Sequence, residues 1–228
     1  MKKIVKRLVQ RLFENSSRSR RRSFDVSAQL EVLEQRQLLS ATTTPTPRLN
    51  TQGKIERHAD IHTQIDRGQA DILFVGDSIT QRWAQEGATP FDRHFGAFDT
   101  INLGIGGDAT QSVLWRLQDY DLGNVSPEVI VLNVGTNNLC HPSRGLCTGS
   151  DSPQDTADGI EANVDYLRQA LPNAQILLVG LLPRGEFSDD ALRQATIDTN
   201  LLISEFGDDD EFVPVSYTHL TLPTNREV

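Results

Sequence analysis

Residues 72–80 read ILFVGDSIT, an apolar run that ends abruptly in a glycine, an acid and a serine. Four further runs rich in Val, Ile and Leu cover residues 98–103, 129–134, 176–181 and 212–215. Most are continuous rather than alternating in polarity, which is typical of strands covered on both faces. Helical patterns separate them, so the sequence predicts an α/β fold with a doubly wound parallel sheet in the flavodoxin-like order 2-1-3-4-5.

The two longest helical patterns carry recognisable ends. Ser152-Pro153 offers an N-cap and a proline for the first turn, and Pro172 stops the pattern that follows. The second pattern begins at 188–190 and stops at Gly207. Its expected buried face consists of Leu192, Ala195, Leu202 and Phe206.

Charge divides the chain into unequal parts. Residues 1–53 hold eleven Lys and Arg against four Asp and Glu, a net charge of +7, whereas residues 54–228 carry −16. We expect a basic N-terminal extension over 1–53, a folded domain over 54–215 and a non-native tail over 216–228. The acidic body argues against a nucleic-acid partner, which needs clustered Lys and Arg. No run approaches the roughly 18 apolar residues of a membrane helix, so we expect no transmembrane segment.

The N-terminal extension has features of an export-related segment. Residues 1–13 form a short basic amphipathic pattern, and residues 30–41 resemble a motif found near the start of many large exported bacterial proteins. The twin-arginine-like run at 20–24 lacks the apolar stretch that normally follows. A solvated extension is the alternative, so an exported or cell-surface location and a cytoplasmic one both stay open. Residues 41–47, rich in Thr and Pro, are interpreted as a linker.

Polar residues follow the first three strands, at the carboxyl ends where ligands bind in such sheets. They occupy residues 76–80, 104–108 and 135–138. Ser78 can act as a nucleophile if a base takes its proton. The N–H groups of Ser78 and Gly107 and the Asn137 amide can form an oxyanion hole, in which one donor contributes roughly 3–4 kcal/mol. Each residue alone is more often a turn or cap residue, so their order and spacing carry the argument.

These three segments resemble the signature blocks of the SGNH (GDSL-type) hydrolase family. Within it, residues 104–117, 134–138 and 180–185 are most similar to the catalytic-subunit type of platelet-activating-factor acetylhydrolase and its bacterial relatives. The resemblance covers about residues 54–215. It implies a three-layer α/β/α sandwich with a five-stranded parallel sheet, no cofactor, and hydrolysis of small acyl esters, chiefly acetyl esters of carbohydrates or lipids. It assigns Ser78 as nucleophile and places Gly107 and Asn137 in the oxyanion hole.

The end of the chain departs from that family. There the base and its orienting acid lie in a late Asp-x-x-His block, after the fifth strand. Here residues 216–228 contain one histidine, His219, with Ser216 three positions before it. The run also resembles a tail that recurs on unrelated proteins from sequence assembly. We therefore expect that the catalytic block and the last helix are missing, and that His219 is not the base.

The other histidines and the cysteines receive no catalytic role. His58 and His62 have the i, i+4 spacing of a metal pair, but without a third ligand nearby a solvated helix face is the better interpretation, and we expect no metal site. Cys140 and Cys147 can close a disulfide worth about 2.5 kcal/mol if the protein is exported, and are free thiols otherwise. His94 lies on the short segment after the first motif and has no acid partner at a suitable spacing. His141 follows the third motif, where it could line the pocket, but a loop histidine is the better interpretation.

Two functions from other classes remain as alternatives. A dinucleotide binder would use Gly104-x-Gly106-x-x-Ala109, but this pattern follows the second strand, and the next strand ends without the acid that binds ribose. A non-catalytic carbohydrate- or lipid-binding module would keep the pocket without the base. Turnover of a generic acetyl ester separates this module from an enzyme.

Overall fold

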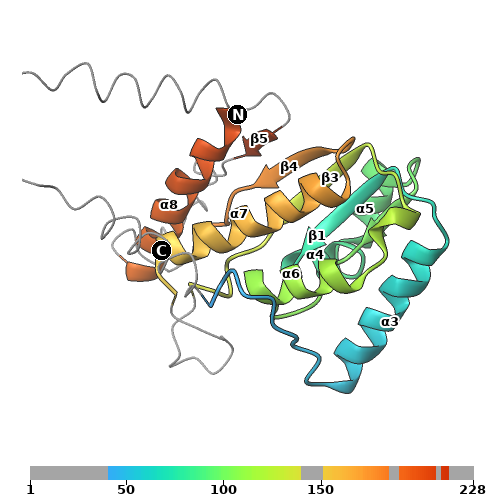
Figure 1. Cartoon of the computed structure of the whole chain (residues 1–228), viewed down its shortest axis with the longest axis horizontal. Helices are drawn as coiled ribbons and strands as arrows, with labels where there is room; N and C mark the ends of the chain where they lie inside the picture. Colours follow the sequence, from blue (N-terminus) through green and yellow to red (C-terminus); the bar gives the residue numbers. More distant parts are fainter. Residues whose placement is uncertain (1–40, 140–150, 185–189, 209–211, 216–228) are drawn as a thin grey trace, which may run out of the picture. The chain divides into compact units, whose positions relative to one another are not determined.

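The structure, a computed structural model, describes residues 41–139, 151–184, 190–208 and 212–215. These residues belong to the compact unit Ser40–Val228, and the unit Met1–Leu39, with the export-related features expected there, lies outside the described residues. The α-helices of the described part are α3 (Gln52–Asp66), α4 (Ser78–Trp83), α5 (Ala88–Phe95), α6 (Thr110–Asp119), α7 (Pro153–Ala170) and α8 (Ala191–Ser204) (Figure 1). The strands are β1 (Ile72–Gly76), β2 (Thr100–Asn102), β3 (Val129–Asn133), β4 (Gln175–Val179) and β5 (Phe212–Val215), with two short 3₁₀ turns, η1 (Leu122–Asn124) and η3 (Glu205–Asp208).

The strands pair in parallel in the order β2-β1-β3-β4-β5. Leu73 of β1 lies opposite Ile101 of β2 and Ile130 of β3, so the first three strands are in register at one level. This confirms the α/β class with a parallel sheet, which the alternation of strand and helix patterns predicted. The strand β2 is shorter than the apolar run, because Phe98 closes a turn by donating its N–H to the Phe95 carbonyl and is 50% exposed.

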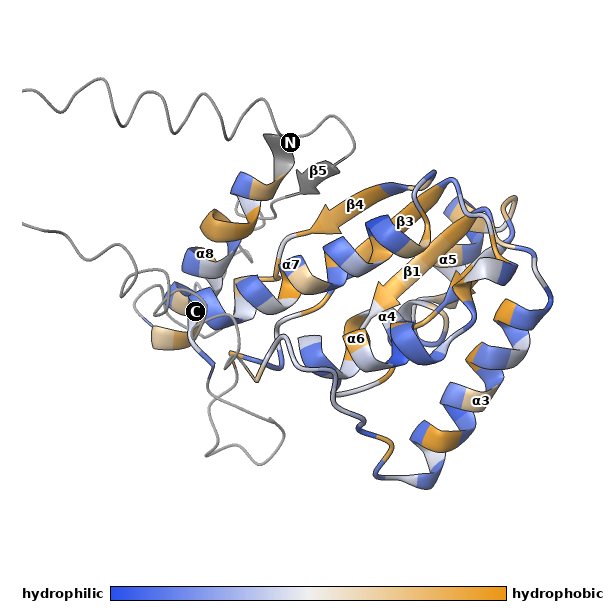
Figure 2. Cartoon of the chain, viewed as in Figure 1, coloured by the Kyte–Doolittle hydropathy of each residue, from blue (hydrophilic) through white to orange (hydrophobic). Residues whose placement is uncertain are grey.

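The sheet has an apolar layer on each face. Leu73, Ile130 and Leu132 point into the larger layer, which α3, α6 and α7 cover. Phe74 and Val131 point to the opposite face, where aromatic side chains of α4 and α5 pack edge-on against Phe74: Trp83, Phe91 and Phe95. In Figure 2 the strands β1, β3 and β4 are hydrophobic along their length, whereas α3 and α7 are mixed, as expected for helices that cover a sheet.

The helix ends follow the predicted caps more closely than the predicted buried faces do. Ser152 caps α7 in a capping box with Asp155, as the Ser-Pro pair indicated. For α8 the expected apolar face was only partly right, since Leu202 and Phe206 pack against the core but are not its most buried residues. The buried residues of α8 are Thr196, Thr199, Asn200 and Ile203, while Leu192, Ala195, Leu202 and Phe206 are half-buried. The physical reason is that Asn200 faces inward, where its side chain accepts from the Leu181 N–H and donates to the Leu181 carbonyl.

The Thr/Pro segment before α3 packs against the domain, where a linker had been expected. Thr42 is buried, and its hydroxyl donates to the Asp155 carbonyl at 2.6 Å. The Thr110 hydroxyl donates to the Thr42 carbonyl, and the Thr46 N–H donates to the carbonyl of Gln111. Residues 41–47 therefore bridge the N-terminal ends of α6 and α7. Within the described part of the chain, no helix is long and apolar enough to span a membrane.

Candidate active site

Ser78 is the first residue of α4, immediately beyond the carboxyl end of β1. Asp77 caps this helix, because its carboxylate accepts a hydrogen bond from the Ile79 N–H at 2.9 Å. Gly76 is required before it, since a Cβ at this position would collide with the Thr80 side chain and a carbonyl of β3. Ser78 is half-buried, and in the described part of the chain no group is hydrogen-bonded to its hydroxyl.

The loop after β2 lies against the start of α4. The Gly106 N–H donates to Gln81 Oε1 at 2.7 Å, and a Cβ built on Gly106 would lie 3.8 Å from the Ser78 Cβ. Gly107 follows with a φ of +77°, a conformation that residues with side chains rarely adopt. The Arg48 guanidinium occupies the space beside it, because a Cβ at Gly107 would come within 2.5 Å of Arg48 Nη1. The backbone angle therefore favours glycine at position 107, whereas the Arg48 side chain is flexible and could shift to make room for a Cβ.

Asn137, in the loop after β3, joins the other two loops. Its Nδ2 donates to the Asp108 carbonyl at 2.8 Å and to Asp77 Oδ2 at 3.2 Å. Asp77 directly precedes Ser78 and Asp108 directly follows Gly107, so the three residues singled out from the sequence meet at one edge of the sheet. Both donor positions of the Asn137 amide are engaged within the protein. The oxyanion-hole role of this group therefore stays a prediction.

The adjacent Asn138 has a structural role that was not predicted from the sequence. It is fully buried, and its Oδ1 accepts from the Thr110 N–H at 3.0 Å. Its Nδ2 lies within hydrogen-bond distance of the Thr110 hydroxyl and of Asp151 Oδ2. Asn138 thus fixes the loop after β3 to the start of α6, which leaves Asn137 at the site.

A buried ion-pair network beneath the site was not found from the sequence. Asp108 is 2% exposed, and its carboxylate accepts from Arg116 Nε at 2.8 Å and from Lys54 Nζ at 3.2 Å. Arg116, 1% exposed, also donates to the Leu103 carbonyl and, at 3.2 Å, to the Gly76 carbonyl. This guanidinium holds the ends of β1 and β2 together below the loop that carries Gly107. The signal that could have revealed it was a charged residue, Arg116, at helical spacing from the apolar residue Val113 of α6.

Burial raises the pKa of Asp77 to about 6, with the nearby Asp108 charge acting in the same direction and the hydrogen bond from the Ile79 N–H opposing both. The unfolded chain therefore releases this proton at lower pH than the folded chain does. Asp77 stabilises the fold fully only below its unfolded pKa, and that contribution is lost as the pH rises through about 6.

We predict that Asp77→Asn weakens this pH dependence. Between pH 4 and pH 7 the wild-type chain should lose about 2 kcal/mol of unfolding free energy relative to Asp77→Asn, because the asparagine has no proton to release. Asp77→Asn should also lower the unfolding free energy by the same amount at both pH values, because the Asn137 amide loses one of its two acceptors. Urea denaturation at the two pH values measures both effects. Asp92→Asn, which replaces an exposed carboxyl group on α5, is the control, and a wild-type pH dependence in Asp77→Asn would contradict the assignment.

None of the histidines in the described ranges forms a hydrogen bond with Ser78. His58 and His62 lie on α3, where His62 Nε2 is 3.0 Å from Asp119 Oδ2, and His94 is exposed on α5. The residues His141 and His219, with the predicted disulfide pair Cys140 and Cys147, lie outside the described residues.

The glycine loop considered for a dinucleotide is filled by the protein itself. Its Gly106 N–H is bound to Gln81, and a Cβ at Gly104 would collide with the backbone of Gln81 and Asp77. The buried Asp108 carboxylate lies at the end of the same loop. A pyrophosphate needs free N–H groups and no nearby anion, so this arrangement disfavours the dinucleotide alternative.

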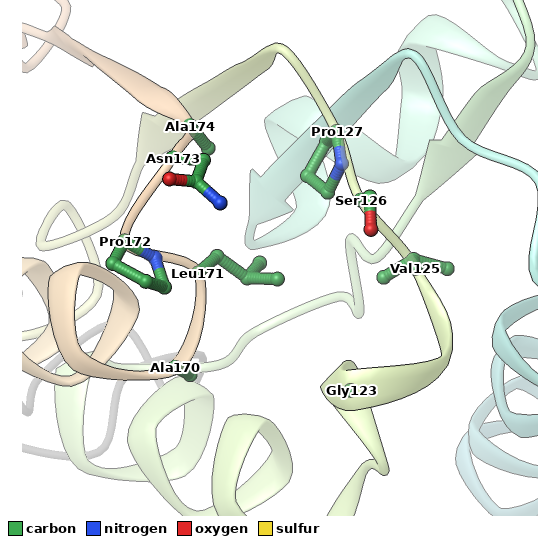
Figure 3. A pocket seen from close by; sticks show the side chains of 9 residues that line it. All are labelled: Gly123, Val125, Ser126, Pro127, Ala170, Leu171, Pro172, Asn173 and Ala174. Carbon is green, nitrogen blue, oxygen red and sulfur yellow. The ribbon is translucent and has the colours of Figure 1, made fainter.

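A shallow cavity of about 220 Å³ opens at the other edge of the sheet (Figure 3). It lies between the loop that precedes β3 and the loop that precedes β4, and its lining residues are Gly123, Val125, Ser126, Pro127, Ala170, Leu171, Pro172, Asn173 and Ala174. Because these loops enter the strands at their amino ends, the cavity lies across the sheet from Ser78. Its lining includes the Ser126 hydroxyl but no titratable side chain, so the cavity itself offers no acid or base to activate that serine.

A family model described as the GDSL-like Lipase/Acylhydrolase family matches residues 74–227, more than half of the chain. The platelet-activating factor acetylhydrolase IB subunit alpha2 of Rattus norvegicus is 40% identical over 135 residues, which are 59% of this chain and 53% of that protein. The beta-subunit homolog of Drosophila melanogaster is 35% identical over 134 residues, 59% of this chain and 54% of that protein. The chain thus spans about half the length of the curated relatives it matches.

Solved structures with low sequence identity share the fold. A GDSL-like lipase from Bacteroides thetaiotaomicron superposes with a TM-score of 0.53 at 22% identity, over 70% of this chain and 76% of that one. An acetylxylan esterase from Geobacillus stearothermophilus gives a TM-score of 0.51 at 12% identity, over 64% of this chain and 75% of that one.

Proposed function

Because the chain belongs to the GDSL-like lipase/acylhydrolase family, we propose that it is a serine esterase with Ser78 as its nucleophile. The observation that carries the proposal is the meeting of three loops at the carboxyl edge of the sheet. Ser78 begins α4, and the Gly106–Gly107 turn lies against it. The Asn137 side chain donates to Asp77, which precedes Ser78, and to Asp108, which follows Gly107.

In the proposed reaction the Ser78 Oγ attacks the carbonyl carbon of an ester, and the carbonyl oxygen becomes an oxyanion. The N–H groups of Ser78 and Gly107 and the Asn137 Nδ2 donate to that oxygen. To do so, Asn137 gives up one partner, and the bond to Asp77 is the longer of the two, at 3.2 Å against 2.8 Å. The serine proton passes through a base to the leaving alcohol, and water then hydrolyses the acyl-enzyme.

Small acyl esters, chiefly acetyl esters of carbohydrates or lipids, are the proposed substrates. Relatives with 40% identity are named as platelet-activating factor acetylhydrolase subunits, which supports an acetyl group. The acetylxylan esterase with a similar fold is a weaker support, because 12% identity carries the fold alone.

A serine nucleophile needs a base that takes its proton, and among the described residues we find no candidate for that base. We propose that His219 does not act as the base, since Ser216 stands where an Asp-x-x-His block has its aspartate. On that basis the 228-residue chain is a slow esterase whose oxyanion hole and nucleophile remain in place. Hydrolysis of p-nitrophenyl acetate that depends on Ser78 tests the function, and equal rates for the wild type and Ser78→Ala would contradict it.

A non-catalytic carbohydrate- or lipid-binding module is the second candidate. The observation in its favour is that no described histidine is hydrogen-bonded to Ser78. Such a module would bind an acetylated sugar or a lipid with equal affinity in the wild type and in Ser78→Ala, and would show no turnover that depends on Ser78.

We predict that Gly107→Ala lowers the unfolding free energy by about 1–3 kcal/mol, because alanine must adopt a φ of +77°. The turnover that depends on Ser78 should fall by about 10²-fold or more, since the displaced N–H no longer reaches the oxyanion. Urea denaturation and p-nitrophenyl acetate hydrolysis measure the two effects. The double variant Arg48→Ala/Gly107→Ala should regain only the part of the unfolding free energy that Gly107→Ala loses through the clash with Arg48.

The control for this prediction is Gly123→Ala. A Cβ at Gly123 meets only the Asp121 carboxylate at an ordinary 3.4 Å, and Gly123 lines the cavity at the opposite edge of the sheet. Wild-type turnover in Gly107→Ala would remove this residue from the proposed oxyanion hole.

A further inference from the structure

Three potential metal ligands from two helices meet on the surface formed by α3 and α6. His58 and His62 lie one turn apart on α3, and Asp119 is the last residue of α6. The Nε2 atom of His62 is 3.0 Å from Asp119 Oδ2, and that of His58 is 3.5 Å from the same oxygen. All three ligand atoms lie within 4.8 Å of one another. The third ligand, absent from the neighbouring sequence, thus comes from a helix 57 residues further along the chain.

His58 is the independent indication that this cluster binds a ligand. The residue is 7% exposed, and among the described residues its buried Nε2 has no hydrogen-bond partner. Leaving a buried polar nitrogen unsatisfied costs roughly 1–3 kcal/mol, so this nitrogen, 3.5 Å from Asp119 Oδ2, calls for a partner.

Aromatic side chains hold the two imidazoles in place. The His58 ring stacks against Trp115 and Tyr120, with ring centroids 5.4 Å and 5.0 Å away, and the His62 ring packs edge-on against Tyr120 at 4.8 Å. The side chains of His62 and Asp119 are 35% and 44% exposed, so an ion can enter from solvent.

We propose that His58, His62 and Asp119 bind a Zn²⁺-type ion that joins α3 to the C-terminal end of α6. Two imidazole nitrogens and one carboxylate oxygen suit Zn²⁺, whereas Mg²⁺ and Ca²⁺ prefer oxygen ligands throughout. Three protein ligands leave a fourth position to water. The site is separate from Ser78, because α6 begins at the active-site edge with Thr110 and extends for ten residues, or about 15 Å, to Asp119. Its role is to stabilise the packing of α3.

The test is Zn²⁺ binding to the metal-free 228-residue protein, measured by calorimetry for the wild type, His62→Ala, Asp119→Asn and His94→Ala. The last variant removes an exposed histidine outside the cluster and is the matched control. We expect the wild type and His94→Ala to bind one more ion than His62→Ala, and Asp119→Asn to bind that ion roughly 10-fold more weakly or worse. His58 is left intact because its aromatic packing supports the fold.

Thermal unfolding gives a second measurement that does not involve esterase activity. Saturating Zn²⁺ should raise the Tm of the wild type and of His94→Ala by roughly 5 °C, and should leave the Tm of His62→Ala unchanged. An equal number of bound ions in His62→Ala and His94→Ala would overturn the proposal, because the ion would then be held elsewhere. Absence of Zn²⁺ binding by the wild type would overturn it as well.

Discussion

Replacing Arg116 with methionine is expected to lower the free energy of unfolding by about 3–5 kcal/mol, the usual loss when one partner of a buried ion pair is removed. The change leaves the Asp108 carboxylate, 2% exposed, without its 2.8 Å partner. It also removes the donors that the carbonyls of Leu103 and Gly76 share at the ends of two strands. Lys54 remains at 3.2 Å, but burial lowers its pKa and makes it a weaker substitute. Urea denaturation of the purified protein measures the loss.

Comparison with three other variants gives this prediction its specificity. The Arg116→Met/Asp108→Asn double variant should recover part of the loss, because the buried Asp108 carboxylate is no longer present, although Lys54 then loses its charged partner. Arg116→Lys should fold and fall between the wild type and Arg116→Met. Arg82→Met breaks the exposed i, i+4 pair with Glu86 and should cost at most about 0.5 kcal/mol. An unfolding free energy of Arg116→Met within about 1 kcal/mol of the wild type would show that the network is not structurally important.

The parallel α/β fold could be predicted because its strands are local apolar runs. A buried strand such as β3 must be apolar on both faces. Its five successive residues, VIVLN, show this directly, because only the last is polar. The cap of α7 is equally local, since Ser152, Pro153 and Asp155 lie within four positions. The buried face of α8 could not be predicted in this way. One of its inward polar residues, Asn200, is satisfied by the backbone of Leu181, which is nineteen residues away.

The candidate site shows the same division between local and distant information. Ser78, Gly107 and Asn137 could be proposed because each follows a strand, and the carboxyl ends of parallel strands share one edge. The partners that hold them could not, because they join distant segments. Arg48 approaches Gly107 from the segment before α3, and the third ligand of the histidine pair lies on another helix. The structural role of Asn138 could not be predicted either, because its partner, the Thr110 N–H, lies 28 residues away.

The 228-residue chain is expected to hydrolyse p-nitrophenyl acetate slowly, and Ser78→Ala should abolish the enzymatic part of that rate. A serine hydroxyl is a poor nucleophile at neutral pH without a base, and general-base catalysis contributes about 10²–10⁴-fold. An oxyanion hole and substrate binding without a triad still leave roughly 10³–10⁴-fold over water. His219→Ala should match the wild type, because we propose that this residue is not the base. His94→Ala, which removes an exposed histidine of α5, is the control for nonspecific effects.

Added imidazole is expected to raise the rate of the wild-type chain, because it can take the proton of the Ser78 hydroxyl in place of a side-chain base. Imidazole also hydrolyses the ester in solution, so the informative quantity is the rate of the wild type minus that of Ser78→Ala at each imidazole concentration. This difference should rise and then saturate, because the imidazole must occupy a position next to the Ser78 hydroxyl. It should rise equally in His219→Ala and in His94→Ala. A fast chain that His219→Ala inactivates and imidazole restores would identify His219 as the base and reverse our interpretation of residues 216–228. A difference of zero at every imidazole concentration, in a chain that denaturation shows to be folded, would remove Ser78 as the nucleophile and favour the binding module.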